Sequence, residues 1–313
     1  METLAKTTAA AMTTAQVLNG YMANIDASER TVDSYKKNLA AWHSYLTTQY
    51  TEDAPELLAT RADLVAYKKE LAEQYKPATV NARLVAIRGL YAYLQAEGVK
   101  QDITAGIKNV KYNRQGAKDA ITPAQTEELL AKKGESLADL RDRAILVLMT
   151  MRGLRTVEIT RANIGDIRTL SGKAVLYIQG KGHSDKDEYT VLSPEILAIL
   201  NEYLAARRCH DLEAPLFAAT GNRNKDGRMT TRSVSRIAKS SLRAINIDSP
   251  RITAHSLRHT AVTNDLLAGA SIQEAQVLAR HKNIETTTIY AHNIDRLEGK
   301  PERAIDNFIK LTA

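Results

Sequence analysis

The 313-residue chain has an ordinary globular composition, with 44% hydrophobic and 25% charged residues, and its length suits about two domains of ~100–200 residues each. No apolar run approaches the ~18 residues of a membrane span, and the amino terminus has no apolar core of signal-peptide length. We therefore expect a cytoplasmic protein without a membrane partner. A single cysteine, Cys209, excludes an internal disulfide and a cysteine-based metal cluster.

Positive charge is concentrated in one part of the chain. The formal net charge is +7, and residues 76–118 carry eight basic side chains against only Glu97 and Asp102. Such a stretch can be a nucleic-acid interface, but it can also be no more than a solvated helix face. Charge alone therefore leaves both interpretations open.

Apolar residues recur at helical spacing through the first hundred residues. The periodicity predicts helices over residues 13–25, 29–49, 60–74 and 76–98. Ser28 and Thr60 suit helix N-caps, Pro77 suits a first turn and Gly98 suits a helix end. We expect a four-helix domain over about residues 11–110. Its predicted core contains Trp42, Leu46, Leu84, Ile87 and Leu90.

A polar, aperiodic segment around Gly116 predicts a linker, which we place at residues 111–118. Two alternating runs around a polar turn, within residues 173–193, predict a β-hairpin. The second domain, residues 119–313, is therefore expected to be mainly α-helical with a small antiparallel sheet. Its predicted helices cover residues 122–134, 137–154, 193–208, 230–245, 253–270, 271–283 and 284–293.

The segment "HSLRH" gathers two imidazoles and a guanidinium. Helical spacing places His255, Arg258 and His259 on one face. The zinc-protease pattern needs a Glu directly after the first His, where this chain has Ser256, and no third ligand is evident, so we expect no metal. A phosphate site and an ordinary core histidine both remain compatible with this segment alone.

Three further stretches carry side chains suited to phosphate chemistry. "GLRTVE" contains Arg155 and Glu158, "GKG" places Lys181 in the predicted hairpin, and "HKNIETTTIYAH" places His281 nine residues before Tyr290. Taken in order with "HSLRH", these stretches closely resemble the motifs of the tyrosine recombinase, or phage integrase, family. The resemblance covers nearly the whole chain and rests on all four motifs together.

The resemblance implies a fold and an activity. The family places a SAM-like, four-helix core-binding domain ahead of its catalytic domain. Its members cut and rejoin DNA through a 3′-phosphotyrosyl intermediate, and need no cofactor. We expect a site-specific DNA recombinase that integrates or excises a mobile element or resolves dimers. Because the four-helix domain begins so early, we expect no extra arm-binding domain, as in Xer-type recombinases and short mobile-element integrases.

The resemblance also implies the roles of the central side chains. Arg155 and Arg258 would bind the non-bridging phosphate oxygens, because a planar guanidinium makes two directed, charge-assisted bonds. Tyr290 would be the nucleophile. A free tyrosine titrates near pH 10, so cationic surroundings and a nearby base must activate it.

Other side chains would handle protons and orientation. Lys181 would protonate the leaving 5′-oxygen, but Lys186 competes for this role because the hairpin tip is longer and more acidic than is usual in the family. His255 would assist proton transfer, and His281 would hydrogen-bond the scissile phosphate. The residues expected to orient these groups are Glu158 and His259. Arg280 replaces a glycine that is common in the family before the second histidine.

The expected partner is double-stranded DNA with inverted-repeat core sites, clamped by the two domains. The residues expected to contact its phosphates are Lys76, Arg83, Arg88, Lys108, Lys111 and Arg114. The family's carboxy-terminal segment docks in trans, so the apolar face of residues 303–313 predicts a head-to-tail tetramer on DNA. That face could instead fold back on its own domain.

Two other classes of function stay open. One is a nicking and closing enzyme similar to type IB topoisomerases, against which the tail argues. The other is a non-catalytic DNA-binding regulator, against which the intact set of catalytic side chains argues. The sequence leaves open the DNA site, the spacer length, a partner recombinase or accessory protein, and the choice between chromosome resolution and mobile-element integration.

Overall fold

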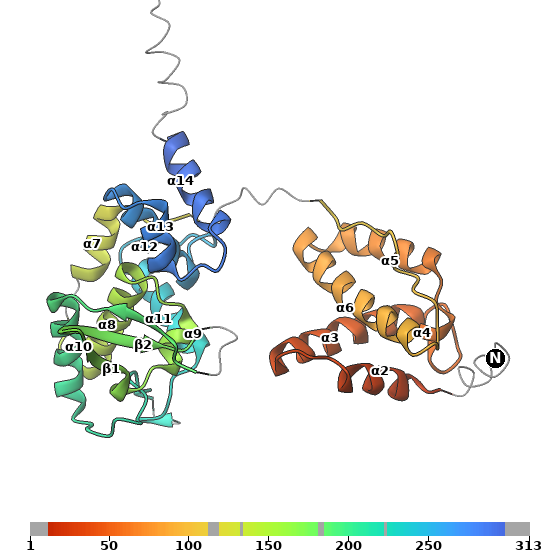
Figure 1. The fold of residues 1–313 in the computed structure, drawn as a ribbon, viewed down its shortest axis with the longest axis horizontal. Coiled ribbons are helices and arrows are strands. Elements are labelled where there is room, and N and C mark those ends of the chain that lie inside the picture. The colour runs from red at the N-terminus through yellow and green to blue at the C-terminus, as the bar shows by residue number, and fades with distance from the viewer. Residues whose placement is uncertain (1–11, 112–118, 132–133, 181–184, 222–223, 298–313) are drawn as a thin grey trace, which may run out of the picture. The chain divides into compact units, whose positions relative to one another are not determined.

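The computed structural model describes residues 12–111, 119–131, 134–180, 185–221 and 224–297. The chain forms two compact units, Met1–Gly116 and Ala117–Ala313. Both are built mainly from helices (Figure 1). Within the described part of the chain, no helix combines the length and apolarity that crossing a bilayer requires.

Helices of the first unit pack around one apolar core. They are α2 (Thr14–Ala23), α3 (Glu29–Leu46), the one-turn α4 (Pro55–Leu58), α5 (Arg61–Gln74) and α6 (Pro77–Ala96). The four longer helices confirm the four predicted from periodicity. Periodicity does not predict α4, because a single turn is too short to show a repeating pattern.

The predicted helix signals of this unit are confirmed. The side chain of Ser28 accepts a hydrogen bond from the Thr31 amide, and that of Thr60 accepts one from the Asp63 amide. Gly98 adopts a left-handed φ of +67° just after α6, a conformation that favours glycine at a helix end.

All five predicted core residues are at most 1% exposed. The indole Nε1 of Trp42 donates to the Tyr91 hydroxyl (3.3 Å), which in turn donates to the Glu56 carbonyl (2.9 Å). Trp42 is therefore a core residue whose one polar atom is satisfied.

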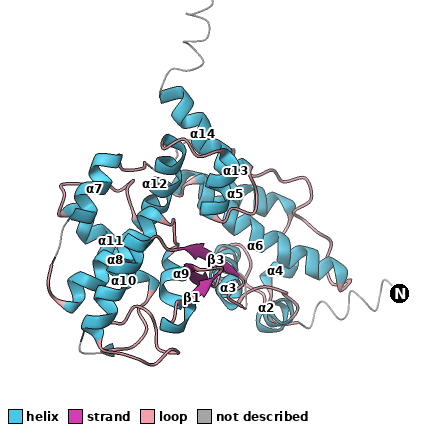
Figure 2. Cartoon of the chain, turned by 60° about the vertical axis from the view of Figure 1, so that its left-hand side comes forward, coloured by secondary structure: helices cyan, strands magenta, loops and turns pink. Residues whose placement is uncertain are grey.

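The second unit combines helices with a small antiparallel sheet (Figure 2). Its strands are β1 (Ile167–Leu170), β2 (Lys173–Ile178) and β3 (Glu188–Val191), in the order β1-β2-β3. The β2–β3 pair, in which Tyr177 lies opposite Tyr189, confirms the predicted hairpin. The third strand, β1, is not predicted because its residues are mostly exposed and carry no alternating pattern.

The helices of this unit confirm those predicted beyond the linker, with two short additions that periodicity does not predict, α9 and the 3₁₀ turn η1. In chain order they are α7 (Pro123–Ala131), α8 (Leu137–Met151), α9 (Thr156–Arg161), η1 (Ile164–Asp166), α10 (Pro194–Arg207), α11 (Thr231–Arg243), α12 (Ala254–Leu267), α13 (Ile272–Ala279) and α14 (Glu285–Leu297).

A turn at Gly153 and the packing of three helices bring distant motifs together. Gly153, at a left-handed φ of +61°, ends α8 and lets the chain turn, so that extended Arg155 precedes α9. Helices α12, α13 and α14 pack against one another at one end of the unit (Figure 1). The segments that carry His255, His281 and Tyr290 therefore meet.

Candidate active site

Side chains from α12 and α14, from the chain before α9 and from the turn after α13 line one pocket of about 440 Å³. It contains five of the six predicted catalytic residues. Its described lining is Arg155, Gly180, Glu188, His255, Arg258, His259, Arg280, His281, Lys282, Asn283, Thr286 and Tyr290.

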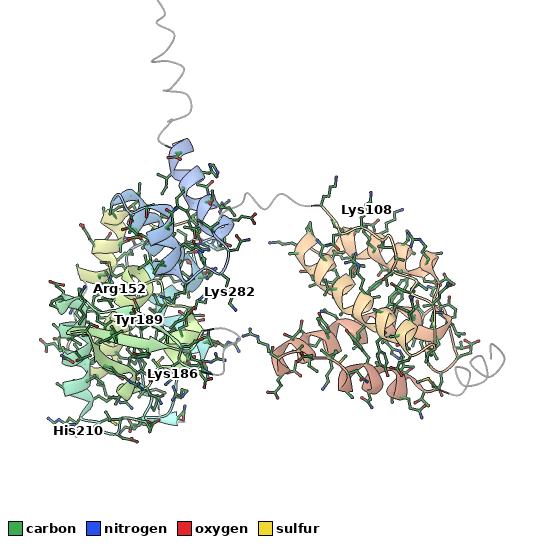
Figure 3. The ribbon with its side chains drawn as sticks, in the orientation of Figure 1. Lys108, Arg152, Lys186, Tyr189, His210 and Lys282 are labelled. Atoms are coloured by element: carbon green, nitrogen blue, oxygen red, sulfur yellow. The ribbon has the colours of Figure 1, made fainter. Side chains whose placement is uncertain are left out.

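The sixth predicted residue, Lys181, lies outside the described residues, but its neighbour Gly180 lines the pocket. Lys186, the competing lysine, is absent from the described lining. Its Nζ lies 2.5 Å from Oδ2 of Asp166, a buried carboxylate in η1. Figure 3 labels this lysine together with Lys282 of the pocket.

Arg258 is the most deeply buried of the charged residues in the pocket, at 2% exposure. Its Nη1 donates to the Gly153 carbonyl (2.6 Å), and its Nη2 donates to the Ala279 carbonyl. Burial, followed by the charges of Arg155 and Arg280, lowers the pKa of Arg258 to about 9. The guanidinium is therefore held between the α8–α9 turn and the end of α13, in a region of strong positive potential.

Arg155 is held by Glu158, one turn along α9. The carboxylate accepts from the backbone amide of Arg155 (2.8 Å) and from its Nη1 (2.6 Å). It also accepts from Nη2 of Arg280 (3.0 Å). Burial alone would raise the pKa of Glu158. The charge of Arg280, together with the backbone amide and the guanidinium of Arg155, lowers this pKa by more than burial raises it, so the net shift is downward. Glu158 is therefore a buried, ionised partner of two arginines.

Tyr290 lies among the imidazoles. Its hydroxyl contacts Nδ1 of His259, and the His259 ring packs edge-on against His255 with centroids 4.5 Å apart. Burial raises the pKa of Tyr290 to about 12, although Arg258 and Arg155 act in the opposite direction. The hydroxyl is therefore protonated at neutral pH and needs an acceptor for its proton.

His281 is kept neutral by its surroundings. Burial, then the charges of Arg258, Arg155, Arg280 and His255, lowers its pKa to about 4. Its Nδ1 lies 2.9 Å from Oγ1 of Thr287, a fully buried hydroxyl on α14. This contact fixes the ring and leaves Nε2 for another partner.

Two residues of this arrangement are not predicted from the sequence. Thr287 lies six residues after His281, and nothing in its pattern marks it as a partner of that ring. Arg280 stands out only as a departure from a common glycine. Its side chain is 6% exposed and reaches Glu158.

The predicted DNA-contacting residues divide into two groups. Lys76, Lys108 and Lys111 are exposed, and Figure 3 shows Lys108 at the surface of its unit. Arg83 and Arg88 are only partly exposed. Arg83 lies over the ring of Tyr75, 4.3 Å from its centroid, and donates to the Tyr67 hydroxyl.

Arg88 donates to the Ile107 carbonyl (2.7 Å) and to Oδ1 of Asn109 (2.8 Å). Arg114 lies outside the described residues. Within the described part of the chain, no group of three or more His, Cys, Asp or Glu side chains is placed to hold a metal ion.

Comparison with known proteins gives matches over both units. The phage integrase family matches residues 119–296, and the phage integrase N-terminal SAM-like domain matches residues 15–98. The tyrosine recombinase XerD of Yersinia pestis is 30% identical over 280 residues, which are 88% of this chain and 91% of the relative. The tyrosine recombinase slr0733 of Synechocystis sp. is 28% identical over 278 residues, 85% and 87% of the two chains.

Solved structures show the same fold. A XerH site-specific recombinase bound to palindromic difH substrate, in a post-cleavage complex, aligns with a TM-score of 0.68 at 18% identity, over 88% of this chain and 81% of that one. A lambda integrase dimer bound to a COC′ core site aligns with a TM-score of 0.68 at 18% identity, over 89% and 95%. The predicted fold class and the family resemblance are confirmed.

Proposed function

The chain belongs to the phage integrase family of tyrosine recombinases, and we propose that it cuts and rejoins double-stranded DNA through a 3′-phosphotyrosyl intermediate on Tyr290. The observation that carries this proposal is the pocket itself. It gathers a tyrosine hydroxyl, two motif arginines and three histidines from segments far apart in the sequence. A pure DNA binder has no need of a buried nucleophile.

In the proposed cleavage step, Oη of Tyr290 attacks the scissile phosphorus as the bond to the 5′-oxygen breaks. The tyrosine proton must leave, and Nδ1 of His259 is in contact with that hydroxyl. We therefore assign to His259 the orientation of the nucleophile and the uptake of its proton. His255, packed against His259, assists the transfer.

The phosphate oxygens acquire charge as the bond forms. Arg155 and Arg258 supply directed cationic donors, and neutral His281 supplies a further hydrogen bond. Because these groups are fixed by Glu158, Gly153 and neighbouring backbone, little reorganisation is needed at the moment of reaction. Two arginines can thus neutralise the phosphate without a metal or nucleotide cofactor.

The departing 5′-oxygen needs a proton, and we assign this role to Lys181. Gly180, just before it, lines the pocket, whereas Lys186 is paired with buried Asp166. These two observations favour Lys181 over its competitor.

Site-specific recombination joins two duplexes, so the proposed complex is a tetramer on inverted-repeat core sites. XerH bound to a palindromic substrate supports an inverted-repeat site, and a lambda integrase dimer on a core site supports more than one protomer on each site. The apolar face of residues 303–313, which lies outside the described residues, would dock on the neighbouring protomer.

The test is covalent capture on nicked duplexes made from DNA that flanks the gene. The nick lets the cleaved fragment diffuse away, so the adduct accumulates. Wild-type protein should give a band of protein bound to DNA on a denaturing gel, and Tyr290→Phe should bind DNA but give none. An adduct that persists in Tyr290→Phe would reject the assignment.

A further inference from the structure

Arg280 has an unexpected backbone conformation for an arginine. It ends α13 at a left-handed φ of +53°, and the His281 amide bonds back to the Gln276 carbonyl (3.1 Å). This helix ending favours glycine, because a Cβ atom is disfavoured there. The chain nevertheless has a large side chain at this position, and that side chain is turned inward.

The buried guanidinium joins the two segments that carry the phosphate-binding groups. Its Nη2 donates to Oε2 of Glu158 (3.0 Å) and to the Gly153 carbonyl (3.2 Å), and its Nη1 donates to the Arg152 carbonyl (3.3 Å). These acceptors belong to the α8–α9 turn and to α9, next to Arg155. Arg280 itself directly precedes His281.

The ion pair between Arg280 and Glu158 also changes the charge balance of the pocket. Arg155 and Glu158 alone would cancel each other as a close pair, and among the described residues of the pocket this would leave Arg258 as the uncompensated guanidinium. Arg280 supplies a second cation to the same carboxylate, 3.0 Å from its Oε2. Glu188 is a weaker counter-charge, with 3.9 Å between its Oε2 and Nε of Arg280.

We propose that Arg280 is a positioning residue with two roles. Its charge neutralises Glu158, so that the positive charge of Arg155 is available to the scissile phosphate. Its hydrogen bonds hold the turn that carries His281 against the α8–α9 turn. This inference rests on the proposed function for its effect on catalysis. Its effect on the environment of His281 can be measured without DNA.

The variants are Arg280→Gln, Arg280→Lys and the double variant Glu158→Gln/Arg280→Gln. Arg208 gives a matched control, because it is also an arginine at a left-handed φ (+55°) that ends a helix, α10, and it is not part of the described pocket lining. Arg208→Gln therefore makes the same chemical change in the same backbone setting. Thermal melting of each variant checks that it is folded.

The first readout is the rate of covalent adduct formation on a nicked duplex that wild type cleaves. We expect Arg280→Gln to be at least tenfold slower than wild type. The rate of Arg280→Lys should lie between those of wild type and Arg280→Gln, because lysine keeps the charge but lacks the several directed donors of a guanidinium. The double variant should be faster than Arg280→Gln, because it removes the unpaired carboxylate, but slower than wild type, because the Glu158 carboxylate no longer holds Arg155. A purely structural role predicts that the double variant is no faster than Arg280→Gln.

The second readout is the NMR titration of the His281 ring in the full chain. Arg280 is one of the charges that lower the pKa of His281, with Arg258, Arg155 and His255. Arg280→Gln should move this pKa toward its ordinary value, and Arg208→Gln should not. Normal cleavage by Arg280→Gln, or a double variant as slow as the single one, overturns the catalytic part of the inference. An unmoved His281 titration overturns the electrostatic part, even if wild type cleaves no duplex and the proposed function itself fails.

Discussion

The hydroxyl of Tyr290 on α14 contacts Nδ1 of His259 on α12, although 31 residues separate the two in the sequence. The contact depends on the packing of α14 against α12. It brings a hydroxyl whose pKa is about 12 against an imidazole nitrogen. His259 is expected from the sequence to orient its neighbours, and its ring is in direct contact with the Tyr290 hydroxyl.

His259→Ala should make cleavage strongly dependent on alkaline pH. Without the imidazole, the reaction must wait for Tyr290 to ionise by itself, and its raised pKa keeps that fraction small at neutral pH. The adduct rate of the variant should therefore be far below wild type at pH 7 and should rise steadily up to pH 10. Wild type should change much less. The control is His292→Ala, an exposed histidine on α14, the helix that carries Tyr290. Parallel pH profiles for wild type and His259→Ala would contradict the assigned contact.

Thr287→Val should slow cleavage, because it removes the hydroxyl that holds the His281 ring in place. One neutral hydrogen bond contributes about 0.5–1.5 kcal/mol, which corresponds to a rate loss of about 2- to 10-fold. Thr287→Ser keeps the hydroxyl and should stay close to wild type. Thr288→Val provides the control, because the Thr288 hydroxyl bonds instead to the Ile284 carbonyl. Equal rates for Thr287→Val and Thr287→Ser would show that the hydroxyl is not needed.

Acid should destabilise the second unit through His281. Its pKa in the folded chain is about 4, below the ordinary 6.5, so the unfolded state binds this proton first as the pH falls. Stability linked to this group is therefore complete above pH 6.5 and is lost progressively between pH 6.5 and 4. At about 1.36 kcal/mol per pKa unit the loss is at most about 3.4 kcal/mol, and solvent access to the ring reduces it.

The check is urea unfolding of wild type and His281→Gln at pH 7 and pH 4.5, followed by circular dichroism. The free energy of unfolding of wild type should fall more between the two pH values than that of the variant. The single tryptophan, Trp42, lies in the core of the first unit. Its fluorescence transition should be the same in both proteins. Equal acid sensitivity in the circular dichroism transitions would exclude the His281 linkage.

The exposed lysines of the basic stretch should control the salt dependence of DNA binding. Each phosphate that a lysine no longer neutralises makes the slope of log affinity against log salt shallower by about 0.9. Replacing Lys76, Lys108 and Lys111 together by glutamine should therefore reduce the slope by up to about 2.7. Arg88→Gln should instead lower the melting temperature with little change in slope, because its guanidinium is bonded to Ile107 and Asn109. A triple variant with the wild-type slope would place these lysines away from DNA.

Local patterns predict most of the fold because periodicity, caps and breakers act over a few residues. Thr60 caps α5 and Gly98 follows α6 as expected, and the β2–β3 hairpin follows its alternating runs. The elements that were not predicted, among them α4, α9 and β1, are each six residues or fewer. A segment of that length is specified by its tertiary contacts rather than by its own pattern.

The candidate site likewise combines residues that local motifs predict with contacts that only tertiary packing specifies. Arg155, His255, Arg258, His281 and Tyr290 are predictable because each belongs to a motif, and the structure brings them together in one pocket. The contacts of Arg280 with Glu158 and of Thr287 with His281 could not be predicted, because they depend on how α9, α13 and α14 pack. The expectation that Arg88 contacts DNA rests on its charge alone. In the structure its guanidinium donates to Ile107 and Asn109 of its own unit.

The most direct test of the central claim is to locate the attachment of DNA on the protein. Trypsin cleavage after Lys282 and Arg296 releases residues 283–296, in which Tyr290 is the single tyrosine. Mass spectrometry of the trapped adduct, after nuclease digestion, should find this peptide carrying a 3′-linked nucleotide on Tyr290. A nucleotide on any other residue, or one linked through its 5′-phosphate, would contradict the account.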